Sequence, residues 1–404
     1  MHTDTNAWDI LILGAGLSGL SLAMELAVQS EFQSKRILLI DREKKLGNDR
    51  TWCYWAQSGE LPEEHVSKSW TALTVFGKFS EYALNMEDYR YHMVRSSDFY
   101  KNAFQIIEEA GNIEFLEAVV ERFDPEEGRV FTSKGEFTAD VLFNSAFPKN
   151  LSLPEAGLLG FKTPFSGLKS ASESGGMLQH FKGWIIETDE DVFDPSHATL
   201  MDFRVEQKGS TRFVYVLPLA PNRALVEFTL FSNELLSAEV YDEALEQYIN
   251  SYLGLNNYQI EETEFGVIPM TDQRFPVQVG KCINIGTAAG FVKPSSGYAY
   301  KRTQEKIKIL VANRMATGHW NPGEMRSSWR FRWYDSTLLR VLAGDKVGGA
   351  VVFSALFGRL PASLVFRFLD EKSTIWEELR LMMQVPRLPF IFAALKQLLR
   401  NGTF

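Results

Sequence analysis

A glycine turn close to the N-terminus constrains the fold of this 404-residue chain more than any other feature. Gly14, Gly16 and Gly19 form the pattern GxGxxG. Residues 9–13, just before the turn, are an apolar stretch with the length of a buried strand. Residues 18–30, just after it, have the small and apolar side chains of a helix that lies on a sheet. This order predicts the start of a dinucleotide-binding βαβ unit.

Each part of this unit has a role in nucleotide binding. The first glycine permits the tight turn, the second lets the backbone approach a pyrophosphate, and the third lets the helix pack against the strand. The free N–H groups at the helix N-terminus then face the phosphates. A second apolar stretch, residues 36–40, ends at Asp41, which lies 22 residues beyond Gly19 and suits hydrogen bonding to ribose hydroxyls. Ala15 and Arg42 complete the cofactor contacts expected here.

A second glycine segment, late in the chain, favours FAD over NAD. Flavoproteins with an N-terminal fingerprint use such a segment, here residues 284–290, to hold the ribityl chain and the isoalloxazine. Thr287 follows Gly286 where many flavoprotein hydroxylases have an aspartate, so Thr287 or the backbone must supply that contact. Gly297 is expected at the same site.

Three basic residues are candidates for contacts with the flavin phosphates or with the ring nitrogen N1. They are Arg50, Arg95 and Lys293. The alternative for each is a surface salt bridge, which is the commoner fate of such side chains.

The rest of the chain divides by its patterns. Residues 115–145 predict an antiparallel meander followed by a strand, residues 161–264 are rich in strands around one helix at 238–253, and residues 298–316 predict a long helix. We therefore expect an α/β fold with a Rossmann-like FAD-binding domain, a mixed β-sheet substrate domain and a helical C-terminal lobe. The expected ranges are 1–155 and 270–320 for the FAD-binding domain, 156–269 for the substrate domain and 321–404 for the lobe. The lobe helices are expected to break at Pro361, Pro386 and Pro389.

Composition excludes several classes of function. The net charge of −9 and the lack of a basic stripe argue against a nucleic-acid partner. The uncharged run at residues 347–358 is shorter than the about 20 residues that span a bilayer, and we expect a cytoplasmic protein without a signal peptide. Cys53 and Cys282 form no CxxC pair, so neither a disulfide nor a metal site is expected. Aromatic residues make up 13% and either fill the core or line a pocket for an apolar guest.

Glu227 is the candidate catalytic residue. Residues 223–231 predict a strand whose two faces are both largely apolar, and Glu227 is the one acid within it. A carboxyl group buried in such surroundings has a raised pKa and can act as a general acid near neutral pH. Two alternatives are an exposed edge-strand glutamate and an ion pair with Arg212 or Arg223. His180 is expected to be a hydrogen-bonded structural residue.

The apolar C-terminal segments allow two interpretations. Residues 347–369 and 385–399 either pack on the core, or form an interfacial surface that dips into a bilayer with Lys396 and Arg400 near anionic headgroups. Residues 341–404 carry 8 Lys/Arg and 5 Asp/Glu, a balance that suits such a surface.

Several short segments together resemble the lycopene cyclases of carotenoid biosynthesis. They follow the order of that family and lie at residues 49–55, 179–203, 213–231, 265–270 and 286–298. The chain is more similar to the bacterial beta-cyclases than to the plant enzymes, because Glu227 stands alone where the plant motif has two adjacent glutamates. Thr287 agrees with this resemblance, since these cyclases differ from hydroxylases at that position.

The resemblance and the expected chemistry add candidate contacts for the substrate. Trp52 and Tyr298 offer aromatic faces to a cation, and two acids rank second to Glu227. The full set is Trp52, Asp202, Phe228, Glu264, Pro269 and Tyr298.

The resemblance implies a non-redox cyclisation of the linear psi ends of lycopene to beta-ionone rings, by protonation and carbocation ring closure, giving beta-carotene through gamma-carotene. It also implies FAD in the reduced form, with NAD(P)H as the reductant. Lycopene would come from membrane lipid, to which the protein would bind peripherally. Other enzymes of the carotenoid pathway are further partners that the resemblance implies. Two alternatives are an oxidoreductase of the hydroxylase or prenyl-reductase type and a non-catalytic carotenoid-binding flavoprotein. Whether Glu227 or the flavin gives the first proton, whether one or both ends react, and whether the ring is beta or epsilon are left open.

Overall fold

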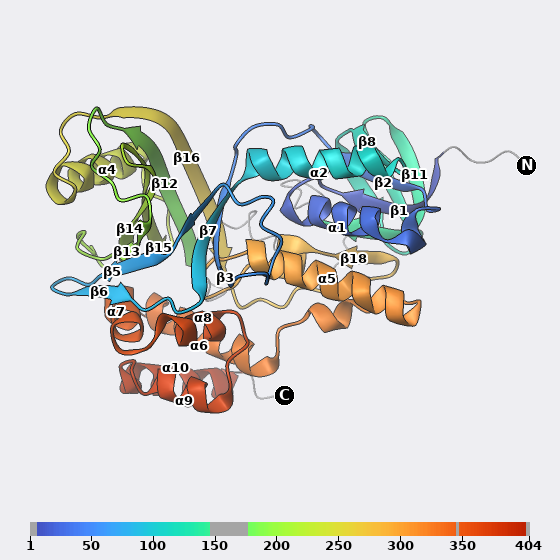
Figure 1. Ribbon diagram of the computed structural model, residues 1–404. Coiled ribbons are helices and arrows are strands. Elements are labelled where there is room, and N and C mark those ends of the chain that lie inside the picture. Colours follow the sequence, from blue (N-terminus) through green and yellow to red (C-terminus); the bar gives the residue numbers. More distant parts are fainter. Residues whose placement is uncertain (1–5, 146–176, 345–346, 401–404) are drawn as a thin grey trace, which may run out of the picture.

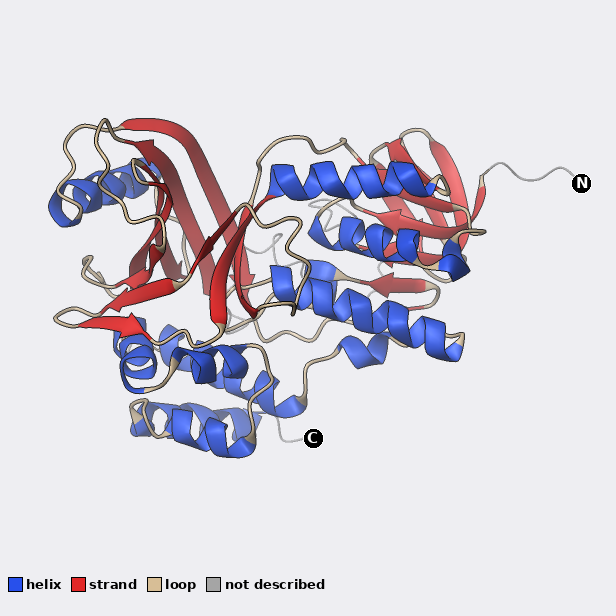
Figure 2. Cartoon of the chain, in the orientation of Figure 1, coloured by secondary structure: helices blue, strands red, loops and turns tan. Residues whose placement is uncertain are grey.

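The computed structural model describes residues 6–145, 177–344 and 347–400. Within these residues the chain forms three β-sheets, helices that cover them, and a group of C-terminal helices (Figure 1, Figure 2). The first sheet and its helices lie on the right of Figure 1, the second sheet lies on the left, and the C-terminal helices lie below. The α/β fold class expected from the sequence is confirmed.

The first sheet contains the predicted βαβ unit. Strand β1 (Ala7–Leu13) pairs in parallel with β2 (Ile37–Asp41), and α1 (Leu17–Val28) and the short 3-10 helix η1 (Ser30–Phe32) connect them. The other strands are β8 (Ile113–Glu117), β9 (Val120–Asp124), β10 (Arg129–Thr132), β11 (Gly135–Asn144), β17 (Gln278–Val279) and β18 (Cys282–Asn284). Their order is β17-β18-β11-β1-β2-β8, and β9 and β10 extend antiparallel from β11 as the predicted meander.

Side chains on β1 alternate between two buried cores. Ile12 packs toward the layer of α1, α2 (Ser96–Ala110) and α5 (Tyr300–Thr317), which is visible in Figure 1. Leu11 points the other way and packs with residues of β9 and β10. Because helices cover one face and the meander covers the other, the strands are apolar at nearly every position.

The second sheet contains the four strands that were predicted between residues 161 and 264, and three more. Its strands are β5 (Ala72–Phe76), β6 (Glu81–Leu84), β12 (Met177–Glu187), β13 (His197–Asp202), β14 (Thr211–Ala220), β15 (Arg223–Ser232) and β16 (Gln259–Met270), in the order β16-β12-β15-β14-β13-β5-β6. Helix α4 (Ala238–Tyr252) covers one face of β12, β14 and β15. The opposite face turns toward the C-terminal helices.

The sheets do not follow the expected domain ranges throughout. Strands β5 and β6 come from within residues 1–155 but join the second sheet, where β5 pairs in parallel with β13. A third sheet, made of β3 (Thr51–Gln57), β7 (Tyr89–Arg95) and β4 (Lys68–Trp70), lies between the two larger ones. The expected boundary at residues 155 and 156 lies outside the described residues.

The C-terminal lobe is helical, as predicted. Its helices are η3 (Pro322–Met325), α6 (Trp329–Ala343), α7 (Gly349–Arg359), α8 (Ala362–Leu369), α9 (Ile375–Met382) and α10 (Arg387–Arg400). Pro361 separates α7 from α8 and Pro386 precedes α10, as expected. The predicted break at Pro389 is wrong: this residue lies in the first turn of α10, where a backbone N–H has no partner within the helix, so proline is tolerated.

Buried ion pairs hold the lobe against the rest of the chain. The ammonium of Lys293 lies 2.9 Å from a carboxylate oxygen of Asp335 on α6 and 3.0 Å from one of Glu371, beyond α8. Arg302 on α5 also contacts Glu371, at 2.7 Å. Lys293 is 1% exposed, and removing one partner of such a pair would leave a buried charge uncompensated. Among the described helices, none has the length and apolar character needed to cross a bilayer.

Candidate cofactor and active site

The GxGxxG turn has the geometry that the sequence predicted. Gly14 has a φ of 98°, a left-handed conformation that favours glycine, and its N–H donates to the carbonyl of Ile40 at 2.7 Å. A Cβ on Gly19 would lie 1.9 Å from the carbonyl oxygen of Gly14, so only glycine lets α1 approach β1 this closely. A Cβ on Gly16 would meet no atom within 4 Å. The space in front of α1 is therefore open for a phosphate group.

The late glycine segment meets the start of α1. Strand β18 pairs in parallel with β11, which brings the 3-10 helix η2 (Gly286–Ala289) to the same edge of the sheet as the first glycine turn. Gly286 has a φ of 63°, and a Cβ there would lie 2.3 Å from the hydroxyl of Ser18 on α1. Two segments some 270 residues apart in sequence thus form one site.

The end of β2 contributes Asp41. Its carboxylate accepts a hydrogen bond from the backbone N–H of Ala15 at 2.6 Å, so it lies directly beside the glycine turn. Arg42 is exposed and lies 3.4 Å from its neighbour Glu43. Asp41 is therefore well placed for a ribose, whereas Arg42 has no fixed position toward the site.

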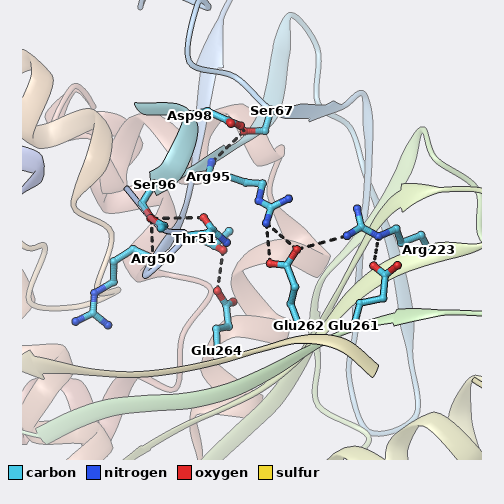
Figure 3. Close-up of polar contacts among 12 residues, drawn as sticks. Arg50, Thr51, Ser67, Arg95, Ser96, Asp98, Arg223, Glu261, Glu262 and Glu264 are labelled. Atoms are coloured by element: carbon cyan, nitrogen blue, oxygen red, sulfur yellow. Dashed lines mark hydrogen bonds and ion pairs between the residues drawn. The ribbon is translucent and has the colours of Figure 1, made fainter. Parts of the chain in front are cut away.

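The three basic candidates have different surroundings. The guanidinium of Arg50 is exposed and has no polar partner among the described residues, and it extends away from the other labelled side chains in Figure 3. Arg95 instead forms two hydrogen bonds to the carboxylate of Glu262 on β16, at 2.6 and 2.8 Å (Figure 3). Lys293 is held by the buried acids of the lobe. Of the three, Arg50 is the one left available for a cofactor phosphate.

A cavity of about 290 Å³ lies between the late glycine segment, strand β3 and the second sheet. The predicted residues Trp52, Glu227, Pro269, Thr287 and Tyr298 all line it. Gly297 and Arg50 line it as well, and the ring of Tyr300 lies tilted against that of Trp52, with centroids 5.9 Å apart. Residues of the late glycine segment and of the second sheet therefore line the same cavity.

Glu227 faces this cavity from β15. Its remaining exposure is to the cavity, and Thr229, two residues along the same face, donates a hydrogen bond to it at 2.9 Å. The expected ion-pair alternative is excluded, because Arg223 pairs with Glu261 and Arg212 donates to Ser210. Burial raises the pKa of Glu227 well above its ordinary value.

A second carboxylate adds to this effect. Glu264 on β16 interacts with Glu227, and its charge and hydrogen bonding also raise the pKa of Glu227, while the hydroxyl of Thr229 opposes the change. Gly183 on β12 lies directly opposite both acids in the strand registers. A Cβ on Gly183 would lie 3.2 Å from Glu264 Oε1. The missing side chain at this position is what lets the two acids approach each other across the central strand.

A hydroxyl on the third sheet supports Glu264. Thr51 on β3 donates to Glu264 Oε2 at 2.7 Å, as Figure 3 shows, whereas Glu264 Oε1 is buried and accepts from no hydroxyl or amide donor of the described residues. Because two like charges in such a place repel each other, the neighbouring carboxylate favours the protonated form of Glu227.

Several residues of the site were missed by sequence reasoning. Tyr91 and Tyr215 line the cavity with Tyr298, and the hydroxyls of Tyr91 and Tyr298 lie 2.9 Å apart. Burial raises the pKa of all three phenols, so they remain neutral. Gln179 and Gly183 belong to a segment that resembled the family, but only the pairing of β12 with β15 and β16 shows why they matter.

Three other residues lie away from the cavity. Asp202 is fully buried, ion-paired with Arg204 and hydrogen-bonded by Tyr248 at 2.7 Å. Phe228 points to the other face of β15 and packs beneath α4. His180 contacts hydroxyl groups of Ser232 and Tyr241, and burial lowers its pKa to about 4, in agreement with the predicted structural role.

The residues at the glycine segments fit FAD. The helix α1 has no side-chain cap at its N-terminus, the space before Gly16 is open, and Arg50 is unpaired within the described part of the chain. Gln179 Oε1 is buried and has no hydrogen-bond partner in the part of the chain that the structure describes, and a Cβ on Gly297 would lie 2.1 Å from it. Pyrophosphate and flavin groups would satisfy these free donors and acceptors. No cluster of metal-ligating side chains occurs among the described residues.

Comparison with known proteins assigns this arrangement to a family. The profile of the family described as "Lycopene cyclase protein" matches residues 9–395. The lycopene beta-cyclase of Pantoea ananas is 25% identical over 415 aligned residues, which cover 97% of this chain and 98% of that protein. The chloroplastic lycopene beta cyclase of Nicotiana tabacum is 32% identical over 141 residues, which cover 32% of this chain and 28% of that protein.

Solved structures show the same fold at lower identity. A geranylgeranyl bacteriochlorophyll reductase-like protein from Thermoplasma acidophilum has a TM-score of 0.61 at 14% identity and covers 98% of this chain and 99% of its own. A variant of halogenase PltM in complex with FAD has a TM-score of 0.56 at 12% identity, covering 98% of this chain and 93% of its own. At these identities, the similarity is evidence for a shared fold alone.

Proposed function

Since this chain belongs to the lycopene cyclase family, we propose that it cyclises the linear psi ends of lycopene to beta-ionone rings, producing beta-carotene through gamma-carotene. The position of Glu227 is the observation that carries this proposal. An acid with a raised pKa, and with no cationic partner among the described residues, lines an aromatic cavity beside a segment that fits FAD. Such an acid can protonate an apolar alkene that water would not.

The proposed reaction moves a proton and no net electrons. Neutral Glu227 gives its proton to the terminal double bond of the psi end, which forms a new C–H bond and leaves a tertiary cation. An internal double bond of the same chain attacks this cation and closes the ring. A ring carbon then loses a proton, and the Glu227–Glu264 pair, which has just lost one, accepts it. The enzyme thus returns to its starting protonation state.

Residues around the pair suit a short-lived cation. The faces of Trp52 and Tyr298 line the cavity and attract positive charge through their π electrons. The carboxylate left after proton transfer adds a nearby negative charge. Because the cavity walls are largely aromatic and aliphatic, few water molecules can reach the cation and trap it as an alcohol.

FAD is the proposed cofactor, held by the glycine segments, Asp41, Arg50 and Thr287. In its reduced, anionic form FAD would supply negative charge that stabilises the cation. NAD(P)H is the proposed source of electrons for keeping the cofactor reduced, and it would not be consumed in proportion to product.

The C-terminal lobe is proposed to rest on a membrane, since lycopene dissolves in lipid. Large apolar side chains are exposed on α9 and α10: Trp376 is 81% exposed, and Leu388 and Phe392 are each 67% exposed. Lys396 and Arg380 are exposed on the same helices and suit anionic headgroups. The side chain of Arg400, which was also expected at this surface, lies outside the described residues.

The variant Glu227→Gln tests the proposed function. With reduced FAD and lycopene under anaerobic conditions, ring formation should fall by about 10²- to 10⁴-fold, the usual contribution of a general acid, while FAD titration should give wild-type affinity. Glu234→Gln, an exposed acid just beyond β15, should retain full activity. Full cyclisation by Glu227→Gln, or consumption of reductant in proportion to product by the wild type, would refute the proposal.

A further inference from the structure

A second, larger cavity adjoins the one that contains Glu227. Its volume is about 710 Å³, and it lies between the second sheet and helices α6 to α10. Ser296 and Tyr298 line both cavities, so the two spaces meet at this short segment. Trp55, which lines the larger cavity, lies against Tyr298 with ring centroids 4.5 Å apart.

The walls of the larger cavity are suited to a hydrocarbon. Leu200 and Met201 from β13, Phe231 from β15 and Phe353 from α7 form its inner part. Asp335 also lines it, but its charge is compensated by Lys293 at 2.9 Å. A long apolar chain in this space would bury its surface against these apolar side chains.

The outer end of the cavity reaches the surface on α9 and α10. Four lining residues are also exposed there: Trp376 at 81%, Leu379 at 46%, Met383 at 56% and Ile391 at 51%. Arg380 and Arg387, both exposed, line the same end. Apolar side chains at an opening, bordered by arginines, are the pattern of a surface that contacts lipid acyl chains beneath anionic headgroups.

We propose that the larger cavity holds the part of the polyene that is not being cyclised and that its opening between α9 and α10 is the route from lipid to Glu227. This inference rests on the proposed function. The inner cavity, at about 290 Å³, is at the lower limit of small-molecule sites, which measure about 300–1,000 Å³. It has room for one chain end, and the remainder of a long linear polyene must extend into the adjoining space.

Chain length is the consequence that can be measured. The larger cavity contributes binding energy only for substrates long enough to enter it. A short isoprenoid with the same psi end reaches Glu227 without occupying the larger cavity. Narrowing the larger cavity should therefore weaken the binding of lycopene and leave the short substrate unaffected.

The variant Ala394→Trp narrows this cavity from α10. Ala394 lines the cavity and is half-buried, and its neighbour Ala393 is equally half-buried but is not part of the lining, so Ala393→Trp is a matched control. With lycopene supplied in phosphatidylcholine vesicles, Ala394→Trp should raise the KM for lycopene at least tenfold. The kcat for the short substrate should change little. Ala393→Trp should behave as wild type with both substrates.

A binding measurement removes the dependence on turnover. Trp55, Trp333 and Trp376 line the larger cavity, so bound lycopene should quench tryptophan fluorescence in the Glu227→Gln background. Adding Ala394→Trp should raise the apparent Kd for lycopene at least tenfold. Unchanged Kd and KM for lycopene, or an equal loss with the short substrate, would overturn the inference. Neither result would bear on the role of Glu227 as an acid, which the cyclisation assay of Glu227→Gln tests.

Discussion

Glu227 and Glu264 extend from strands that do not pair with each other, and they interact because Gly183 lies between them on β12. The hydroxyl of Thr229 donates to the first acid and that of Thr51 to the second. Each acid thus accepts a hydrogen bond from one threonine hydroxyl and has the other acid as its neighbour. This arrangement suits the proposed cyclisation, in which a proton is given and later taken back at one place.

The pH dependence of cyclisation should reveal this pair. Burial and then the Glu264 charge raise the pKa of Glu227, so the acid form of Glu227 persists to higher pH than that of an isolated glutamate. Glu264→Gln removes the charge but not the volume, and the pKa of Glu227 should fall. The alkaline limb of the kcat/KM profile should therefore move to lower pH by about one unit.

Glu262→Gln is the matched control for that shift. Glu262 lies on the same strand, two residues before Glu264, and its partner is Arg95. Its substitution should leave the alkaline limb in place. A purely structural role of Glu264 would lower kcat without moving the limb, and a limb that stays fixed or moves to higher pH in Glu264→Gln would contradict the coupling.

At the scale of elements, the cofactor site depends on contact between η2 and α1. The sequence indicated both glycine segments, but the 2.3 Å between a Cβ on Gly286 and the hydroxyl of Ser18 shows that they touch. The parallel pairing of β18 with β11, next to β1, produces this contact. Both segments then lie at the carboxyl ends of the strands, where ligands of open α/β sheets bind.

Gly286→Ala should weaken FAD binding. The substitution forces an L residue to a φ of 63° and pushes against Ser18, at a cost of about 1–2 kcal/mol for the conformation alone, so titration of the apoprotein by flavin fluorescence should show a Kd raised about tenfold or more. Gly47→Ala is the control, because a Cβ there meets nothing within 4 Å. Equal FAD affinity of the two variants would refute the contact.

At the scale of the whole molecule, the lobe is anchored to the segment that follows η2, and none of its described residues lines the cavity with Glu227. Lys293, which follows η2, is anchored to Asp335 and Glu371 of the lobe. Burial alone would raise the pKa of Glu371, but the charges of Lys293 and Arg302 outweigh it and lower the pKa to about 2. Glu371 therefore remains charged at physiological pH, and the lobe stays fixed against the segment that bears Tyr298.

Vesicle binding should depend on the outer face of the lobe. Phe392→Ser removes an apolar side chain that is 67% exposed, and burying such a side chain contributes about 1.5–3 kcal/mol when complete. Flotation with vesicles of phosphatidylcholine and phosphatidylglycerol should show binding reduced several-fold, and salt should reduce it further. Leu46→Ser, at a residue that is 74% exposed on the first domain, should bind as wild type does. Equal loss in both variants, or none in Phe392→Ser, would contradict a lipid-facing lobe.

The sequence by itself determined the features that depend on local order. The turn at Gly14, the strand ending at Asp41 and the acid on an apolar strand at Glu227 were predicted, because periodicity and spacing along a single segment specify them. The same is true of the helical lobe and of most of the second sheet. The prolines were less informative, since Pro389 is tolerated in a first helical turn.

Only the tertiary structure decided which distant side chains meet. The neighbours of Glu227 and the transfer of β5 and β6 to the second sheet follow from strand pairing between segments far apart in the chain. The ion pairs of Arg95 and Lys293 follow from packing between elements that are equally distant in sequence. The register of a strand is set by its partners and by the face it buries, and a shift of one residue would turn Glu264 away from Glu227. The physical reason is that these contacts arise from packing across the fold, which no local pattern of residues records.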